Sequence, residues 1–132
     1  MIALDTNVLV RFLVQDDVDQ ARLAGTVIDQ LSEAEPGFVS REVLVELVWV
    51  LERAYGLDRS DIAAALDGLL FATELVLEEA DDVGPALELY RIDGFGFADL
   101  LIAAASRRAG ARELVTFDRK AARLPGVRLL KA

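Results

Sequence analysis

Four acidic residues stand at positions from which carboxylate chemistry could be organised. Asp5 and Asp118 each follow a short apolar run that is typical of a buried strand, and each precedes a helical pattern. Asp99 opens an alanine-rich helical segment, and Glu46 interrupts an apolar stretch of another helix. The sequence therefore places two carboxylates at strand ends, one at a helix start and one inside an apolar helix.

Each of these acids also has an ordinary structural explanation. The two strand-end aspartates can accept hydrogen bonds from the free N–H groups of the helices that follow them. Asp99 can complement a helix dipole. Glu46 lies in a helix that we expect to be largely buried, where its charge would require a cation, and a solvated polar face shared with Glu42 and Arg53 on the same helical stripe is the alternative. No single acid is specific for function.

The joint pattern is more informative than any member. Four carboxylates that converge would repel one another and raise some of their pKa values, and Mg²⁺ or Mn²⁺ would relieve the repulsion. Such an ion can polarise a phosphodiester and lower the pKa of a bound water without a histidine. We expect four neighbouring polar residues to orient ligands or water: Thr6, Asn7, Ser40 and Thr116.

Composition removes the main alternatives. The chain has no His and no Cys, which excludes Ser-His-Asp and Cys-His catalysis, structural zinc sites and disulfides. Carboxylates, hydroxyls, Lys, Arg and Tyr remain as the chemical groups available. Because carboxylate and carbonyl oxygens are hard ligands, the ions that suit this chain are Mg²⁺, Mn²⁺ or Ca²⁺.

Charge is distributed unevenly along the chain. The net charge is −9 and the pI about 4.4, which by itself argues against a nucleic-acid ligand. Residues 107–132, however, hold eight basic and two acidic residues, a balance of +6, so that residues 1–106 carry −15. This asymmetry allows one face to hold a phosphate backbone while another attracts a basic partner.

Short apolar runs alternate with helical patterns. This alternation predicts an α/β protein, a three-layer α/β/α sandwich with a mainly parallel central sheet, whose ligands sit beyond the carboxyl ends of the strands. The expected strands are residues 2–4, 38–39, 75–77, 113–116 and 127–130. The expected helices are residues 6–13, 17–35 and 41–55, a helix capped by Asp58 or Ser60 that ends at residue 70, a helix from residue 81 or 82 to about residue 92, residues 98–109, and a helical turn over 118–122.

Length and hydropathy complete the expectation. The chain of 132 residues is the size of one domain, so we predict a single domain over 1–132. Hydrophobic residues make up 54% and mean hydropathy is +0.34, so apolar surface can remain for self-association. Because no uncharged apolar stretch of roughly 18 residues and no signal-peptide core occur, we expect a soluble, cytoplasmic protein.

At these residues the sequence resembles the PIN-domain ribonucleases and, more narrowly, the VapC-type toxins of toxin-antitoxin pairs. Four segments carry the resemblance, and their order and spacing match over nearly the whole chain. They are residues 2–9 with Asp5, residues 43–51 with Glu46, residues 97–104 with Asp99, and residues 116–118 with Asp118. Together the four motifs are fairly specific, whereas each alone is weak.

The resemblance implies that these four acids bind Mg²⁺ or Mn²⁺, that water attacks RNA phosphodiesters, and that Thr116 supports the site through its hydroxyl. It also implies a homodimer and a cognate antitoxin that covers the active site, for which the acidic part of the chain would suit a basic arm. Asp93 lies close to Asp99 and is interpreted as a loop acid rather than an accessory ligand.

Two other function classes stay open at this stage. A phosphatase or phospho-receiver with an aspartyl nucleophile would also use an Asp at a strand end beside Mg²⁺. Its usual companions are missing, because Asn7 stands where a second acid is expected and Thr116 where a receiver needs Lys. A non-catalytic partner-binding module, in which the acids are caps and solvated charges, would show no stabilisation by divalent ions.

Overall fold

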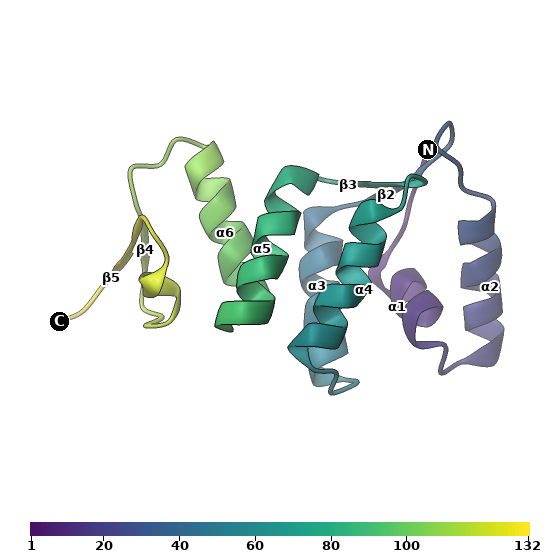
Figure 1. The fold of residues 1–132 in the computed structure, drawn as a ribbon, viewed down its shortest axis with the longest axis horizontal. Helices are drawn as coiled ribbons and strands as arrows, with labels where there is room; N and C mark the ends of the chain where they lie inside the picture. The colour runs from purple at the N-terminus through teal and green to yellow at the C-terminus, as the bar shows by residue number, and fades with distance from the viewer. The chain divides into compact units, whose positions relative to one another are not determined.

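The computed structural model describes residues 1–132 as two compact units (Figure 1). The N-terminal unit comprises residues 1–81 and the C-terminal unit residues 82–132. The boundary falls in the first turn of helix α5 (Ala80–Asp93). Each unit is built around its own parallel strands.

The N-terminal unit contains a three-stranded sheet in the order β1-β2-β3. Both strand pairs are parallel, with Ile2 opposite Gly37 and Gly37 opposite Leu75. Parallel pairing requires a crossover between consecutive strands, and helices supply it here. The elements are β1 (Ile2–Ala3), α1 (Thr6–Val14), α2 (Val18–Asp29), β2 (Gly37–Val39), α3 (Arg41–Arg53), α4 (Arg59–Phe71) and β3 (Leu75–Leu77).

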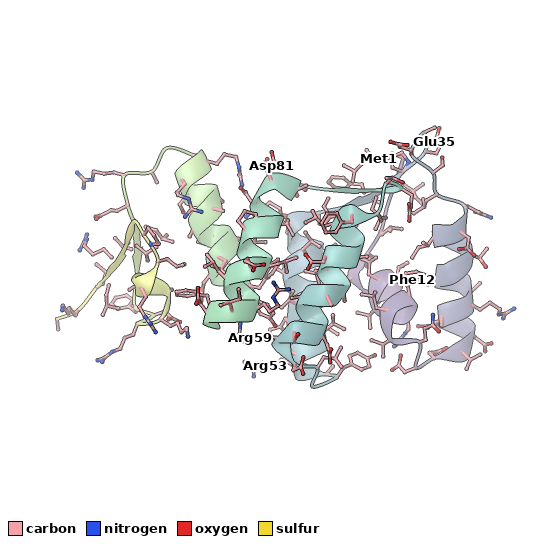
Figure 2. All side chains as sticks on the ribbon, in the orientation of Figure 1. Met1, Phe12, Glu35, Arg53, Arg59 and Asp81 are labelled. Carbon is pink, nitrogen blue, oxygen red and sulfur yellow. The ribbon has the colours of Figure 1, made fainter.

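Helical spacing of leucines builds the core of this unit. Leu44, Leu47 and Leu51 recur every three or four residues along α3 and are fully buried. Helix α1 packs on α2 and α3, and α4 packs on α3 and β3 (Figure 1). The first residue is tied to the loop before β2, because the Met1 amino group pairs with Glu35 at 2.9 Å (Figure 2). This ion pair joins the amino ends of β1 and β2.

The C-terminal unit holds the rest of α5, α6 (Phe97–Arg108), β4 (Leu114–Thr116), a 3₁₀ turn η1 (Ala121–Arg123) and β5 (Val127–Leu129). Strands β4 and β5 pair in parallel, and η1 packs on both. The ring of Tyr90 meets that of Phe97 edge-on, with centroids 6.1 Å apart. An ion pair between Asp82 and Arg108 links the start of α5 to the end of α6.

All five predicted strands are present, and every strand pair is parallel as expected. Three predicted helices differ from the structure by two residues or more at one end, and smaller differences occur at other helix ends. Helix α2 ends at Asp29 rather than residue 35, because Ser32 and Glu35 close a turn through their own hydrogen bonds. The helix expected over 118–122 is the 3₁₀ turn at Ala121–Arg123, and the one expected over 41–55 ends at Arg53.

The predicted α/β class is confirmed by these parallel sheets and their covering helices. Helix α5 begins at Ala80, before the expected start at residue 81 or 82. None of the helices has the length and apolar character needed to cross a membrane.

Candidate active site

The C-terminal unit brings Asp99 and Asp118 close enough to interact electrostatically. Asp99 lies in the first turn of α6, and Asp118 follows the carboxyl end of β4. Burial raises the pKa of Asp99 above its ordinary value, and the negative charge of Asp118 raises it further. Two of the four predicted acids therefore form a pair in which the charged state of one disfavours that of the other.

Asp99 and Thr116 line the same pocket, whose volume is about 180 Å³. The other lining residues are apolar: Ile102, Leu114, Val115, Ala121, Leu124 and Val127. An apolar lining weakens solvation of the Asp99 carboxylate, which accounts for the direction of its pKa shift. The pocket thus presents a carboxylate and a hydroxyl against an otherwise apolar wall.

Asp118 is held in place by two hydrogen bonds. Its backbone N–H donates to Thr116 Oγ1 at 3.0 Å, and its own Oδ1 accepts from the backbone N–H of Ala121 at 2.9 Å. The Thr116 hydroxyl thus acts as an acceptor, which leaves its proton available for a ligand in the pocket. Thr116 therefore holds the backbone of Asp118 in place, and its role in orienting ligands or water stays a prediction.

The turn before α6 depends on glycine at two positions. Gly94 has φ of +73°, a conformation that side chains rarely adopt. A Cβ at Gly96 would lie 2.9 Å from Asp99 Oδ2, so the absence of a side chain leaves room for this carboxylate. The two glycines that flank Phe95 therefore shape the approach to Asp99.

In the N-terminal unit, Asp5 follows β1 and caps helix α1. Its Oδ1 accepts from the backbone N–H of Thr6 at 2.8 Å, and its side chain is exposed to solvent. Thr6 is buried, and its Oγ1 has no hydrogen-bond partner. Asp5 therefore has the capping role described above as its ordinary structural explanation. This single hydrogen bond leaves most of the acceptor positions of the carboxylate available.

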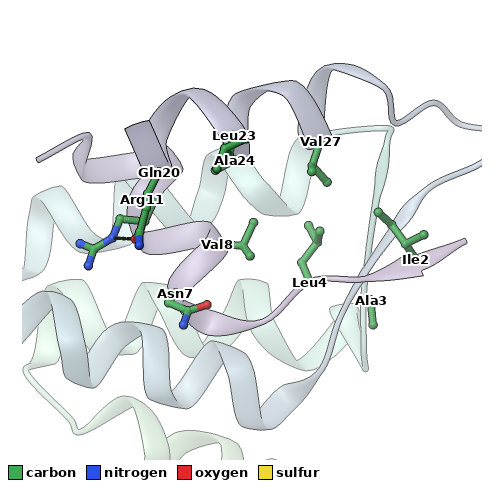
Figure 3. Close-up of a pocket in the computed structure, with 10 residues that line it drawn as sticks. All are labelled: Ile2, Ala3, Leu4, Asn7, Val8, Arg11, Gln20, Leu23, Ala24 and Val27. Carbon is green, nitrogen blue, oxygen red and sulfur yellow. Dashed lines mark hydrogen bonds between the residues drawn. The ribbon is translucent and has the colours of Figure 1, made fainter. Parts of the chain in front are cut away.

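Asn7, another expected supporting residue, lines a groove between β1, α1 and α2 with a volume of about 410 Å³ (Figure 3). Most of its walls are apolar, from Ile2 and Leu4 to Leu23 and Val27. The polar end of the groove is closed by a hydrogen bond of 2.6 Å that Arg11 Nε donates to Gln20 Oε1, shown as a dashed line in Figure 3.

Ser40 and Glu78 follow β2 and β3 as Asp5 follows β1. Because the three strands are parallel, their carboxyl ends lie along one edge of the sheet. Ser40 Oγ accepts from the N–H of Val43 at 3.2 Å, and Glu78 Oε1 accepts from the N–H of Arg41 at 2.9 Å. Sequence reasoning missed Glu78, although an acid directly after a strand is the same signal that identified Asp5.

Glu46 lies in the middle of α3 with its side chain exposed. The expectation that an apolar helix would bury this carboxylate is wrong, because Leu47 and Val48 take the buried face and leave Glu46 outside. Glu42 and Arg53 are exposed as well, so the solvated stripe weighed against function is present. Burial thus gives no argument for a cation at Glu46.

Neither unit gathers three acidic side chains closely enough to hold a metal ion by itself. The donor set nevertheless suits a hard divalent cation, because Asp99, Asp118 and Thr116 offer carboxylate and hydroxyl oxygens. A bound cation would offset the repulsion that raises the pKa of Asp99. The residues of the C-terminal unit therefore fit part of a Mg²⁺ or Mn²⁺ site.

This arrangement of acids at strand and helix ends in a parallel α/β fold agrees with the comparisons to known proteins. The family model for the PIN domain matches residues 2–127, and the chain belongs to the PIN-domain family. Within that family it is of the VapC type. The chain is 31% identical to the VapC ribonuclease of Aquifex aeolicus (strain VF5) over 121 residues. This matched segment covers 91% of this chain and 89% of that protein.

Proposed function

We propose that the protein is a metal-dependent endoribonuclease that hydrolyses RNA phosphodiester bonds. The observation that carries the proposal is the pair of Asp99 and Asp118 beside Thr116, in a chain of the PIN-domain family. Its relative from Aquifex aeolicus is named a ribonuclease. The residues that would hold Mg²⁺ or Mn²⁺ are the four acids Asp5, Glu46, Asp99 and Asp118.

The bound ion would supply a Lewis acid that polarises the phosphodiester and makes water more acidic. Asp118 contributes a carboxylate that accepts a hydrogen bond from the N–H of Ala121, and its backbone N–H is held by Thr116 Oγ1. Asp99 contributes a poorly solvated carboxylate, and Thr116 a hydroxyl proton that can be donated to a phosphate oxygen or to water.

The test is cleavage of a fluorogenic single-stranded RNA by the purified full chain in Mn²⁺. We expect Asp5→Asn, Glu46→Gln, Asp99→Asn and Asp118→Asn to abolish cleavage while the melting temperature shows a folded protein. Matched controls are Glu42→Gln, one helical turn before Glu46, and Asp93→Asn, at the last residue of α5 rather than in a loop as predicted; both should cleave like the wild type. Wild-type turnover by Glu46→Gln, with loss in Glu42→Gln, would contradict the assignment on α3.

Metal binding can be measured separately from catalysis. Since the ion binds the folded chain, Mg²⁺ or Mn²⁺ should raise the melting temperature in a concentration-dependent way. The increase should be smaller in Asp99→Asn and unchanged in Asp93→Asn. An increase that is the same in all three proteins would place the ion elsewhere.

The proposal extends to the biological role: the cytoplasmic toxin of a toxin-antitoxin pair, active as a homodimer and neutralised by a cognate antitoxin. The N-terminal unit carries seventeen acidic and five basic residues, which suits a basic antitoxin segment. The protein from the neighbouring reading frame should abolish RNA cleavage at a stoichiometric ratio. Light scattering should give twice the mass of 14.4 kDa for the toxin alone. Cleavage that persists in the presence of the neighbour would contradict this role.

A further inference from the structure

Phe117 is an aromatic side chain exposed beside the acidic pair. It stands between Thr116 and Asp118 at the end of β4, and 80% of its surface is accessible. A phenylalanine ring in water is unfavourable, since burial of such an apolar side chain stabilises a folded protein. An exposed ring next to a catalytic acid is therefore a candidate for contact with the substrate.

Three cations follow this ring in the sequence: Arg119, Lys120 and Arg123. None of them makes an ion pair. They belong to the basic part of the chain, because the C-terminal unit has nine basic and six acidic residues. Their charges are therefore available to an anionic ligand.

Lys120 is positioned by the turn that leads to Asp99. Its Nζ lies 5.5 Å from the centre of the Phe95 ring, within the range of a cation–π interaction. It also lies close to Gly94, where a Cβ would approach it to 3.3 Å. The ammonium group is thus held beside the loop that precedes Asp99, although no carboxylate pairs with it.

We infer that Phe117 stacks on an unpaired base of the RNA substrate while Arg119 and Lys120 contact the phosphates that flank it. This inference rests on the proposed ribonuclease function and adds the side chains that would hold the substrate beside the acidic pair. Bases in a duplex are already stacked and paired, whereas an unstacked base can lie on an aromatic side chain. The adjacency of a ring and free cations favours this ligand over an apolar protein partner, which would not require the charges.

The binding test is fluorescence anisotropy with a labelled oligoribonucleotide of mixed sequence in EDTA, so that cleavage does not interfere. Phe117→Ala should weaken binding by roughly 5- to 150-fold, which is the range for loss of one stacked base. Phe117→Tyr should bind like the wild type. The matched control is Phe71→Ala, since Phe71 is also 80% accessible and lies in the N-terminal unit; it should leave binding unchanged.

The cations are tested by the salt dependence of binding. Each of Lys120→Ala and Arg119→Ala should lower the slope of log affinity against log salt concentration by about one, because each removes one phosphate contact. Arg22→Ala, an exposed arginine of α2, should leave the slope unchanged. An RNA duplex of the same length should bind the wild type and Phe117→Ala equally.

The outcomes separate this inference from the proposed function. If RNA is cleaved in Mn²⁺ but Phe117→Ala and Phe71→Ala bind and cleave alike, the stacking role is wrong and the nuclease stands. If binding in EDTA depends on Phe117 but no cleavage occurs in Mn²⁺, the RNA surface stands and the nuclease is wrong. If Phe117→Ala instead breaks a homodimer or an antitoxin complex with RNA binding intact, the ring belongs to a protein interface and the inference fails.

Discussion

The first turn of α3 depends on two side chains from the sheet edge, and their removal should destabilise the protein measurably. Ser40 accepts from Val43 N–H, and Glu78 accepts from Arg41 N–H, so two of the four free N–H groups of the helix start are satisfied. Removal of a side-chain cap destabilises a protein by about 1 kcal/mol. We expect Ser40→Ala and Glu78→Ala each to have an effect of this size.

This free energy converts to a change in melting temperature. With an unfolding entropy of about 2.1 cal/mol/K per residue, a chain of 132 residues has about 0.28 kcal/mol/K. A loss of 1 kcal/mol then lowers the melting temperature by about 3–4 °C. The decrease in melting temperature of the double variant should differ from the sum of the two single decreases. The two acceptors serve the same helical turn, so their contributions are coupled.

Thermal unfolding followed by circular dichroism in EDTA measures these shifts. Glu78→Gln and Ser40→Asp should recover most of the stability, because an amide oxygen or a carboxylate can still accept the hydrogen bond. Ser60→Ala, a change of an exposed serine inside α4, is the control and should leave the melting temperature nearly unchanged. A melting temperature of Ser40→Ala and Glu78→Ala equal to that of the wild type would refute the assignment of both caps.

The remaining predictions concern charge and RNA binding. Asp99→Asn should raise the melting temperature in EDTA at neutral pH, because burial and Asp118 raise the folded-state pKa of Asp99, so that its ionised form destabilises the fold. The gain in melting temperature should vanish below about pH 3.9, where Asp99 is protonated in the folded and the unfolded chain. A gain that persists below this pH would contradict this cause. Tyr55→Phe should lower the melting temperature at neutral pH, since the Tyr55 hydroxyl and Arg11 lower the pKa of Asp16 and so stabilise the folded protein. This stabilisation is lost as the pH falls through the folded-state pKa of Asp16. The melting temperatures of the variant and the wild type should therefore become equal in acid. Gly94→Ala should weaken RNA binding and stability together, because φ is +73° at this residue and Lys120 lies against it; unchanged binding and melting temperature would show that the turn can rearrange.

The strand positions could be predicted because apolar runs of three or four residues are bounded by acids, glycine or proline. Leu75–Leu77 and Leu114–Thr116 were found in this way, and Asp118 could then be placed at a strand end. Ser40 could be predicted as a cap, since it precedes an apolar helical pattern. These signals depend only on residues that are neighbours in the sequence, so they can be identified without the structure.

Other features could not be predicted because they depend on partners distant in the sequence. Glu78 caps a helix that begins 37 residues earlier, and only the parallel register of β2 and β3 brings the two together. The exposure of Glu46 depends on which face of α3 is covered by α1 and α4, which the apolar stretch around it does not specify. The early end of α2 follows from a turn at Ser32 that competes with the helix.

The outcome for Glu46 changes the argument for the active site. A buried, unpaired carboxylate would have required a cation on energetic grounds, whereas an exposed one requires nothing. The energetic reason for metal binding is therefore found at Asp99 and not at Glu46. The Asp99 carboxylate is partly buried, faces a second negative charge and shares its pocket with a hydroxyl. If Mn²⁺ stabilises the wild type and Glu46→Gln equally but stabilises Asp99→Asn less, the ion is held mainly by the C-terminal acids, and Glu46 acts on the substrate or on water instead.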